Sequence, residues 1–257
     1  MVQALQGGSL EERVAYLQEL QGSVTQADRE GYAQRLDMSW IYHDSALDGV
    51  VYSSEELEAA VSTQVVSDSS LIPVYDEIRQ HKAAIDLVRS YAAKKRLVIS
   101  LDIIKKIFVT LAPDEVEGKG APTYRKDMPV HRLYFHDIAP PDKISYRMRQ
   151  LVQWVNAPEN KRAMHVVRLG AKAHMQLLQI YPFIKHSGKV SRLLLNMILL
   201  HHGYPPAILH ATERQRYYDA LRGAENTVSR LVNDALISSV ESGIRYFESL
   251  RRASVAR

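Results

Sequence analysis

Apolar residues recur along most of the chain at the three- and four-residue spacing of amphipathic helices. Two of these runs begin with the Ser-x-x-Glu pattern of a capping box, Ser9 with Glu12 and Ser53 with Glu56. The same spacing predicts further helices over 72–94, 101–111, 146–155, 161–180, 190–201, 212–223 and 225–251. Only 12 of the 257 residues are glycine, so few of these helices should be interrupted. The pattern predicts an all-α protein.

One segment, residues 118–137, departs from the helical pattern. Glycine and proline interrupt its first five residues, and Val130, Leu133 and Phe135 then stand among polar and aromatic residues. We expect a small β-hairpin there. By contrast, residues 190–201 are nearly all apolar, which predicts the central buried helix of the bundle.

Composition limits the chemistry and the location. The chain has no cysteine, which excludes disulfides, thiolate metal ligands and cysteine nucleophiles. No apolar signal segment opens the chain, and the longest apolar run is too short to span a bilayer, so we expect a cytoplasmic protein without membrane contact. The net charge is +4, and apart from 94–96 and 251–252 the basic residues are scattered. We interpret these two basic runs as solvated helix ends, and nucleic acid is not an expected partner.

The loop before the central helix has the properties of an anion site. Ser187 and Gly188 lead directly into an apolar helix whose first amides lack partners within the helix, and Lys185, Lys189 and Arg192 add positive charge. Such a helix start binds phosphate in many proteins. The pattern does not favour a P-loop, because the upstream glycine and the preceding strand are missing. From the residues alone, a phosphate site and a capped helix with solvated lysines both remain open.

The string YPFIKHSGKVSRLLLNMILLHHGYPP resembles the signature of the Fic family, His-Pro-Phe-x-Asp/Glu-Gly-Asn-Gly-Arg-x-x-Arg, followed by a leucine-rich helix and Gly-Tyr-Pro-Pro. Other segments resemble family elements in the same order: 39–49 the inhibitory helix, 124–135 the flap that clamps a target peptide, 148–156 the next helix, and 214–221 the segment after the core. The resemblance implies a Fic-type helical bundle with a small β-hairpin flap over 39–250. Residues 1–38 would form an N-terminal helical extension, and residues 251–257 a basic C-terminal tail.

The resemblance also implies that the catalytic loop is rewritten. The family's general base, a histidine, falls on Tyr181, and a phenol with a pKa near 10 is a poor base at neutral pH. The acidic residue that holds Mg²⁺ falls on Lys185, and an ammonium group cannot ligate a metal. The family's Gly-Asn pair falls on His186 and Ser187, and its first arginine on Lys189, which keeps the charge but loses the bidentate fork.

Other positions of the family pattern are kept or nearly kept. Gly188 and the second arginine, Arg192, match. The regulatory glutamate of the inhibitory helix falls on Asp48, which is one methylene shorter, and whether Asp48 reaches Arg192 is an open question at this point. Tyr124 opens the flap and is a candidate contact to a ligand.

Two interpretations of function follow. In the first, the chain is a diverged, metal-independent group-transfer enzyme that does not perform standard AMP transfer, with Lys185 replacing the charge of Mg²⁺ and with His186 or Tyr181 moving protons. In the second, it is an inactive pseudo-Fic that acts as a ligand sensor or a protein-interaction module. A third interpretation, nucleic-acid binding, has only the pI of about 9.1 and a family tendency to carry DNA-binding appendages in its favour.

Both main interpretations use the same pocket and partners. The ligand would be a nucleotide or another phosphate-bearing molecule held without Mg²⁺, and a protein or peptide could bind at the flap. The expected catalytic residues are Tyr181, Lys185 and His186; the expected ligand contacts are Ser187, Gly188, Lys189, Arg192 and Tyr124; the expected regulatory residue is Asp48; no metal site is expected. The sequence leaves the ligand's identity and the oligomeric state open.

Overall fold

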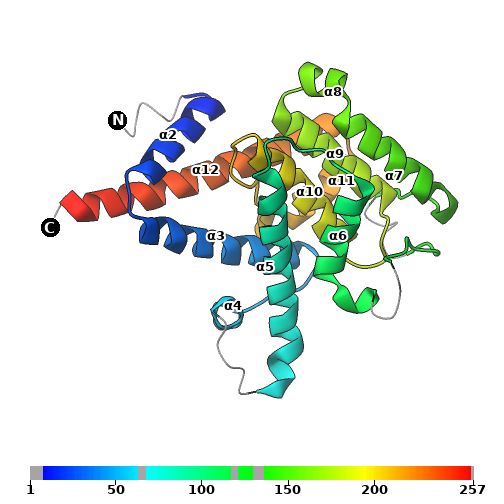
Figure 1. Cartoon of the computed structure of the whole chain (residues 1–257), viewed down its shortest axis with the longest axis horizontal. Helices are drawn as coiled ribbons and strands as arrows, with labels where there is room; N and C mark the ends of the chain where they lie inside the picture. The colour runs from blue at the N-terminus through cyan, green and yellow to red at the C-terminus, as the bar shows by residue number, and fades with distance from the viewer. Residues whose placement is uncertain (1–7, 63–67, 117–120, 130–135, 256–257) are drawn as a thin grey trace.

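The computed structural model describes residues 8–62, 68–116, 121–129 and 136–255, and within these ranges it is helical without strands (Figure 1). Short 3-10 turns cover Ser69–Leu71, Pro113–Glu115 and Ala211–Glu213. The α-helices are α2 (Leu10–Gly22), α3 (Gln26–Leu47), α4 (Ser54–Val61), α5 (Ile72–Ala92), α6 (Leu101–Leu111), α7 (Pro141–Asn156), α8 (Pro158–Ala163), α9 (Val166–Ile180), α10 (Ser187–His201), α11 (Arg214–Arg222) and α12 (Glu225–Val255). The all-α prediction is confirmed for these residues.

Helix starts were predicted better than helix interruptions. Both predicted capping boxes form, with Ser9 and Ser53 each accepting from the backbone N–H three residues later. The single helix predicted over 161–180 is wrong, because α8 ends at Ala163 and α9 begins at Val166. Met164 between them is extended, and the ring of His165 accepts from the backbone N–H of Val167, which caps α9. The apolar spacing continues across this break, so periodicity alone does not reveal it.

The predicted hairpin lies largely outside the described residues, which omit 117–120 and 130–135. The described part of the segment, 121–129 with 136 and 137, contains no strand. Its anchoring to the rest of the protein is described, because the backbone N–H of Arg125 donates to the carbonyl of Pro182 at 2.9 Å. The start of the predicted flap is therefore attached directly to the loop before α10.

Helix α10 is the centre of the molecule, as predicted. Every residue from Ser187 to Leu199 is buried, and α3, α5, α6 and α9 pack around the helix. One apolar cluster joins α10 to α5, α6 and α7, and a second joins it to α2, α11 and α12. Truncating one of its fully buried leucines to alanine would cost about 2–5 kcal/mol. This packing fixes the start of α10, where the candidate site lies.

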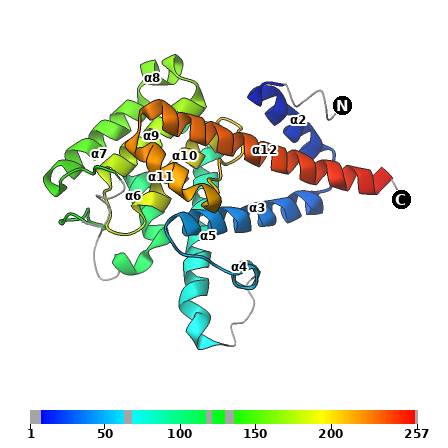
Figure 2. The same cartoon turned by 180° about the vertical axis from the view of Figure 1, so that it is seen from behind.

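Two parts project from this body. Helices α2 and α12 pack together and extend to one side, and the first half of α5 extends downward with α4 beside it (Figures 1 and 2). Helix α3 crosses the proposed domain boundary at 38/39, and α12 crosses the one at 250/251. In the part of the chain that is described, no helix has the length and apolar character needed to cross a membrane.

Candidate functional site

The loop that joins α9 to α10 is closed by its own polar contacts. It begins at Tyr181 (φ 49°) and ends at His186 (φ 60°), which are the two non-glycine residues with positive φ in the described part of the chain. The hydroxyl of Ser187 accepts from the backbone N–H of Phe183 at 2.9 Å and donates to its carbonyl at 2.7 Å. The ring of Phe183 stacks on Phe108 with a centroid distance of 3.9 Å. These contacts hold the first turn of α10 in a fixed position.

His186 has a left-handed backbone conformation at a position where the family pattern has a glycine. Glycine adopts this conformation without strain, whereas a residue with a Cβ adopts it at a cost, so the loop keeps a backbone shape that suits glycine. Burial and the nearby Lys189 ammonium group lower the pKa of His186 to about 4. The imidazole is therefore neutral at neutral pH, and its charged neighbours include Lys189, Glu77 and Asp48.

Tyr181 is part of the core. Only 1% of its surface is exposed, and its backbone ends α9. The buried guanidinium of Arg125 donates from Nε to the Tyr181 carbonyl at 2.7 Å and from Nη2 to the carbonyls of Ala139 and Ile180. Arg125 thus binds together three chain segments at this point, and the Tyr181 ring packs beneath the loop.

Lys185 and Tyr124 lie on the outer side of the loop. They line a cavity of about 220 Å³ together with Phe108 and Phe183. The Lys185 side chain is 64% exposed, and its Nζ lies 2.8 Å from Oε1 of Glu115. The ion pair with Glu115 raises the pKa of Lys185, so this group stays an ammonium. The lysine therefore points away from the start of α10.

Lys189 lies on the inner side and is paired with an acid from α5. Its side chain is 2% exposed, and its Nζ lies 3.2 Å from Oε1 of Glu77. Burial would raise the pKa of Glu77, but the Lys189 charge outweighs this effect and lowers it. The pair is a half-buried salt bridge at the mouth of the site.

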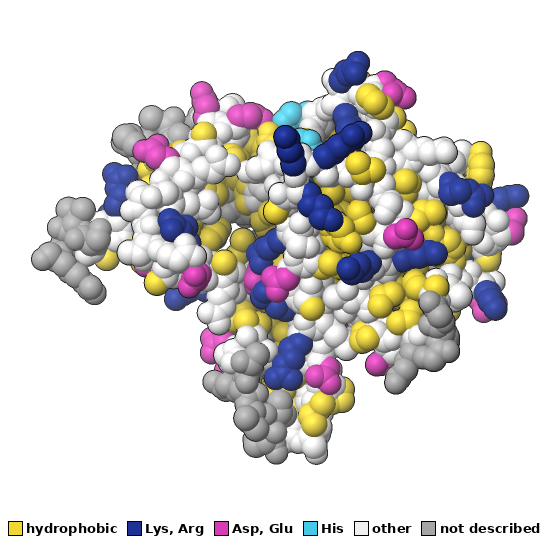
Figure 3. Space-filling view, viewed as in Figure 1, with side chains coloured by type: hydrophobic (Ala, Val, Ile, Leu, Met, Phe, Trp, Pro, Cys, Tyr) yellow, Lys and Arg dark blue, Asp and Glu magenta, His cyan; other side chains and the backbone are white. Residues whose placement is uncertain are grey.

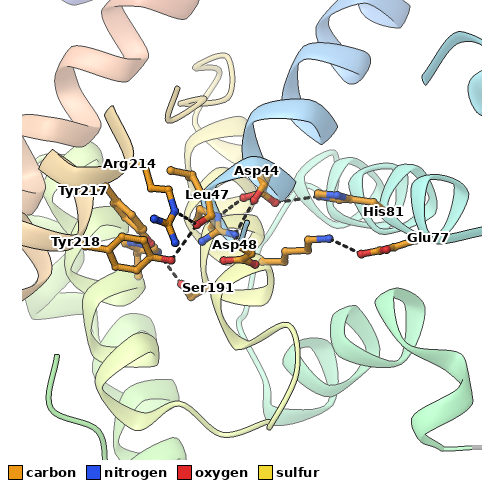
Figure 4. A network of polar contacts seen from close by, with 12 residues as sticks. Asp44, Leu47, Asp48, Glu77, His81, Ser191, Arg214, Tyr217 and Tyr218 are labelled. Carbon is orange, nitrogen blue, oxygen red and sulfur yellow. Dashed lines mark hydrogen bonds and ion pairs between the residues drawn. The ribbon is translucent and has the colours of Figure 1, made fainter. Parts of the chain in front are cut away.

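Arg192 is held by two aspartates, Asp44 in the last turn of α3 and Asp48 directly after the helix. Both aspartates are labelled in Figure 4. Its Nη2 donates to Oδ2 of Asp48 at 3.1 Å, so Asp48 does reach Arg192. Its Nε donates to Oδ1 of Asp44, and Nη2 also donates to the Asp44 carbonyl at 3.1 Å. Side-chain exposure is 4% for Arg192, 3% for Asp44 and 15% for Asp48. Asp44 is the buried counterion, and Asp48 is the one at the surface of the site.

Two buried histidines surround this ion cluster. Nε2 of His81 lies 2.9 Å from Oδ2 of Asp44. Burial would raise the pKa of Asp44, but Arg192 and His81 more than offset it and keep that pKa far below its usual value. His174 bridges the Ser191 hydroxyl, at 2.8 Å, and the Tyr217 hydroxyl, at 3.1 Å. Burial, followed by the Arg192 charge, lowers the pKa of His174 to about 3.

The end of α3 is shaped so that Asp48 faces α10. Gly49 has φ 96°, and its N–H donates to the carbonyl of Ala46 while that of Val50 donates to Ser45, which is the Schellman arrangement. Helix α11 fastens the same helix end, because Arg214 Nε and the Tyr218 hydroxyl both donate to the carbonyl of Leu47, at 3.0 and 3.1 Å. The position of Asp48 is thus set by contacts on both sides of it.

The carboxylate of Asp48 lies at the start of α10. A Cβ built on Gly188 would lie 3.1 Å from Oδ1 of Asp48 and 2.9 Å from Nη1 of Arg192. A side chain at position 188 would therefore force the Arg192 guanidinium, and to a lesser degree the Asp48 carboxylate, to shift. An anion beside the first turn of a helix and bound to an arginine is in the arrangement that phosphate groups adopt. Here the anion belongs to the protein itself.

The structure brings together only part of the predicted site. Gly188, Lys189 and Arg192 converge with Asp48, while Tyr181 lies in the core and Lys185 and Tyr124 share a separate cavity. Sequence reasoning missed the acids that pair with the buried cations, Asp44 with Arg192 and Glu77 with Lys189, and it missed His81, which contacts Asp44. Their spacing carried a signal, because Asp44 precedes Asp48 by four residues and Glu77 precedes His81 by four, so each pair shares a helix face.

Comparison with known proteins agrees with the resemblance. The Fic/DOC family model matches residues 98–199, which include α6 to α9, the loop and all but the last two residues of α10. The protein named Protein adenylyltransferase Fic of Culex quinquefasciatus is 31% identical over 209 residues, covering 80% of this chain and 39% of its own length. The protein of the same name in Drosophila melanogaster is 28% identical over 216 residues, covering 83% and 42%. The chain belongs to the Fic/DOC family.

Solved structures agree on the fold. A Fic domain containing signaling protein of Bacteroides thetaiotaomicron has a TM-score of 0.78 at 19% identity, covering 93% of this chain and 98% of that one. Fic-1 of C. elegans has a TM-score of 0.70 at 21% identity, covering 95% and 73%. At these identities the likeness concerns the fold alone. The chain spans about two fifths of the length of the curated relatives it matches.

The Mg²⁺ that the Fic family places on nucleotide phosphates does not fit the residues present. At the position of the metal-binding acid stands Lys185, whose ammonium group is paired with Glu115 at 2.8 Å. A cation at that position repels a second cation, and an ammonium group has no lone pair with which to bind one.

Proposed function

We infer that this Fic-domain protein binds a phosphate-bearing ligand at the start of α10 without Mg²⁺, and that it acts as a ligand sensor and not as an adenylyltransferase. The observation that carries this inference is the position of Asp48. Its carboxylate occupies the place between Gly188 and Arg192 where a phosphate would bind, which supports an anion site closed from within.

The charges of the site explain how such a ligand would act. Each of the three cations is paired with a carboxylate, and Arg192 is paired with two. A ligand phosphate must therefore displace Asp48, the most exposed of the carboxylates bound to Arg192. Because Asp48 lies at the end of α3, its displacement would change the contacts that hold the end of that helix. This supports a sensor whose conformation responds to occupancy of the phosphate site.

The residues of the loop argue against the family's usual chemistry. The curated relatives are named protein adenylyltransferases. In this chain, the base position holds a tyrosine that is 1% exposed, and the metal-acid position holds a lysine in an ion pair. A general base must reach the proton that it removes, and a phenol packed in the core does not. These two residues therefore do not support adenylyl transfer by the family's route.

A second candidate function rests on His186. Its imidazole is half-buried, is neutral at neutral pH because its pKa is lowered to about 4, and has Lys189 and Asp48 as neighbours. A neutral imidazole beside a phosphate site can accept a proton from a hydroxyl. Metal-independent group transfer with His186 as base is the enzyme alternative to the sensor.

Calorimetric titration with ADP and with inorganic pyrophosphate, each in EDTA and in Mg²⁺, tests the proposal. We expect binding in EDTA with the affinity unchanged by Mg²⁺. Incubation with ATP and Mg²⁺, followed by intact-mass measurement, should show neither a modified protein nor consumed ATP. Binding that requires Mg²⁺ would refute the metal-free site, whereas turnover in EDTA that is lost in His186→Ala would favour the enzyme over the sensor.

A further inference from the structure

Five cations that are separate in the sequence come together at the far end of α10. Lys94, Lys95 and Arg96 follow α5, and Lys161 and Arg162 end α8; we refer to these five residues as the basic cluster. All five are exposed, and among the described residues none of them forms an ion pair. Figure 3 shows several dark blue side chains near the top of the molecule, around the end of α5 and α8.

Specific contacts hold these segments together. Asn156, at the end of α7, accepts from the backbone N–H of Ile99 at 3.0 Å and donates to its carbonyl at 2.6 Å, which places the segment after α5 beside α8. Burial and the Arg96 guanidinium lower the pKa of Lys161, which is consistent with the two segments lying close together. Like charges held together without a counterion are the electrostatic feature of a surface for polyanions.

A polar cavity lies on the other side of α8. It has a volume of about 690 Å³ between α7, α8 and α9, within the size range of ligand pockets. Amides are the most frequent side chains of its lining, and a single aromatic ring accompanies them: Gln150, Gln153, Gln176, Gln179, Asn160 and Trp154. One cation and one carboxylate, Arg147 and Glu159, also line the cavity. We refer to it as the amide cavity. Helix α8 contributes Asn160 to the cavity and the next two residues, Lys161 and Arg162, to the basic cluster.

We propose that the basic cluster and the amide cavity bind single-stranded nucleic acid, with backbone phosphates on the cluster and unpaired bases in the cavity. Amide side chains pair with base edges because an amide has two donor hydrogens and an acceptor, although Gln150 and Asn160 each already donate once within the protein, to Tyr146 and to the Trp154 carbonyl. The ring for stacking is that of Trp154, which is half-buried and has Nζ of Lys172 at 5.2 Å from its centroid. An acidic protein segment would use the cations but not the cavity. A membrane surface would require several exposed apolar side chains. Among the described residues that adjoin the cluster in the sequence, Val98 alone is a large exposed apolar residue, which does not favour a membrane.

This surface is distinct from the candidate phosphate site. The ring of His201, in the last turn of α10, contacts the carbonyl of Ala92 at 2.9 Å, just before Lys94. Asp48 and Gly188 lie at the first turn of the same helix. A helix of 15 residues separates the two by about 20 Å. The proposal for this surface therefore does not depend on the proposal that the loop before α10 binds a phosphate-bearing ligand.

Fluorescence anisotropy of a labelled single-stranded oligoadenylate, titrated with the full chain at several salt concentrations, tests the proposal. Five phosphate contacts predict a slope of log K against log[salt] of about −3.5, since each contact to a single strand contributes about −0.7. Lys161→Glu with Arg162→Glu should weaken binding and reduce the slope by about 1.4. Gln153→Ala with Gln179→Ala should weaken binding several-fold and leave the slope unchanged, because amides release no counterions.

The matched control is Arg230→Glu with Arg245→Glu, two exposed arginines of α12 that give the same change in net charge. It should bind like the wild type. Absence of binding at low salt, or an equal loss in the control, would overturn the proposal. Competition by polyglutamate as strong as that by the unlabelled oligonucleotide would reassign the surface to an acidic protein. A preference for duplex over single-stranded nucleic acid would exclude a role for unpaired bases. Unchanged binding in the cavity variants would exclude that role as well.

Discussion

The buried counterion of Arg192 gives the sharpest test of how the site is built. Asp44→Asn keeps the shape of the side chain but removes the negative charge that lies against Arg192 Nε and His81. Breaking a buried ion pair from one side costs about 3–5 kcal/mol because the remaining charge stays buried. Asp48 and the Asp44 carbonyl still bind the guanidinium, so we expect a loss near the lower end, about 3 kcal/mol.

Urea denaturation followed by far-ultraviolet circular dichroism measures this loss. With an m-value of about 3 kcal/mol/M, the midpoint should fall by about 1 M. Asp86→Asn is the control for an exposed pair, because the Asp86 side chain is 53% exposed and bound to Lys82, and it should cost about 0–1 kcal/mol. Equal midpoints for Asp44→Asn and Asp86→Asn would refute the claim that Asp44 holds Arg192 in place.

Three further predictions follow from the same contacts. Lys189→Met should weaken pyrophosphate binding by about 1.5–3 kcal/mol in calorimetry, whereas Lys185→Met, which removes an exposed lysine paired with Glu115, should change it much less. His186→Gly should raise the free energy of unfolding by about 1 kcal/mol by removing a side chain from a left-handed backbone, and an unchanged urea midpoint would contradict this reading of the loop. The unfolded chain protonates His174 below about pH 6.5, whereas the folded protein protonates it only near pH 3. The free energy of unfolding should therefore decrease as the pH is lowered through this window. His174→Gln should reduce this decrease by up to about 1.4 kcal/mol per pH unit, as measured by urea titrations at several pH values.

The sequence predicted most helices because their apolar faces are local and periodic. Helix α6 has the predicted bounds, and both capping boxes are present, since a capping box is a contact between residues three apart. The break at Met164 was missed because the apolar spacing runs through it and only the backbone of two residues changes. Local patterns therefore predicted what local contacts determine.

The site was predicted in part for the same reason. The positions of Gly188, Arg192 and Asp48 followed from the family pattern, and these residues converge. That Lys185 would pair with Glu115 and point outward could not be read from its own loop, because the partner is 70 residues away in the chain. The burial of Asp44 depends on α5 and α10 closing over α3, which only the folded structure reveals.

The measurement that bears most directly on the central claim is the affinity for pyrophosphate, in EDTA, of the wild type and of Asp48→Asn. A ligand that must displace the Asp48 carboxylate loses the free energy of one charged hydrogen bond, about 1.5–3 kcal/mol. Removing that charge should therefore tighten binding by about 10- to 150-fold. Equal or weaker binding in Asp48→Asn would contradict the claim that Asp48 occupies the place of a ligand phosphate.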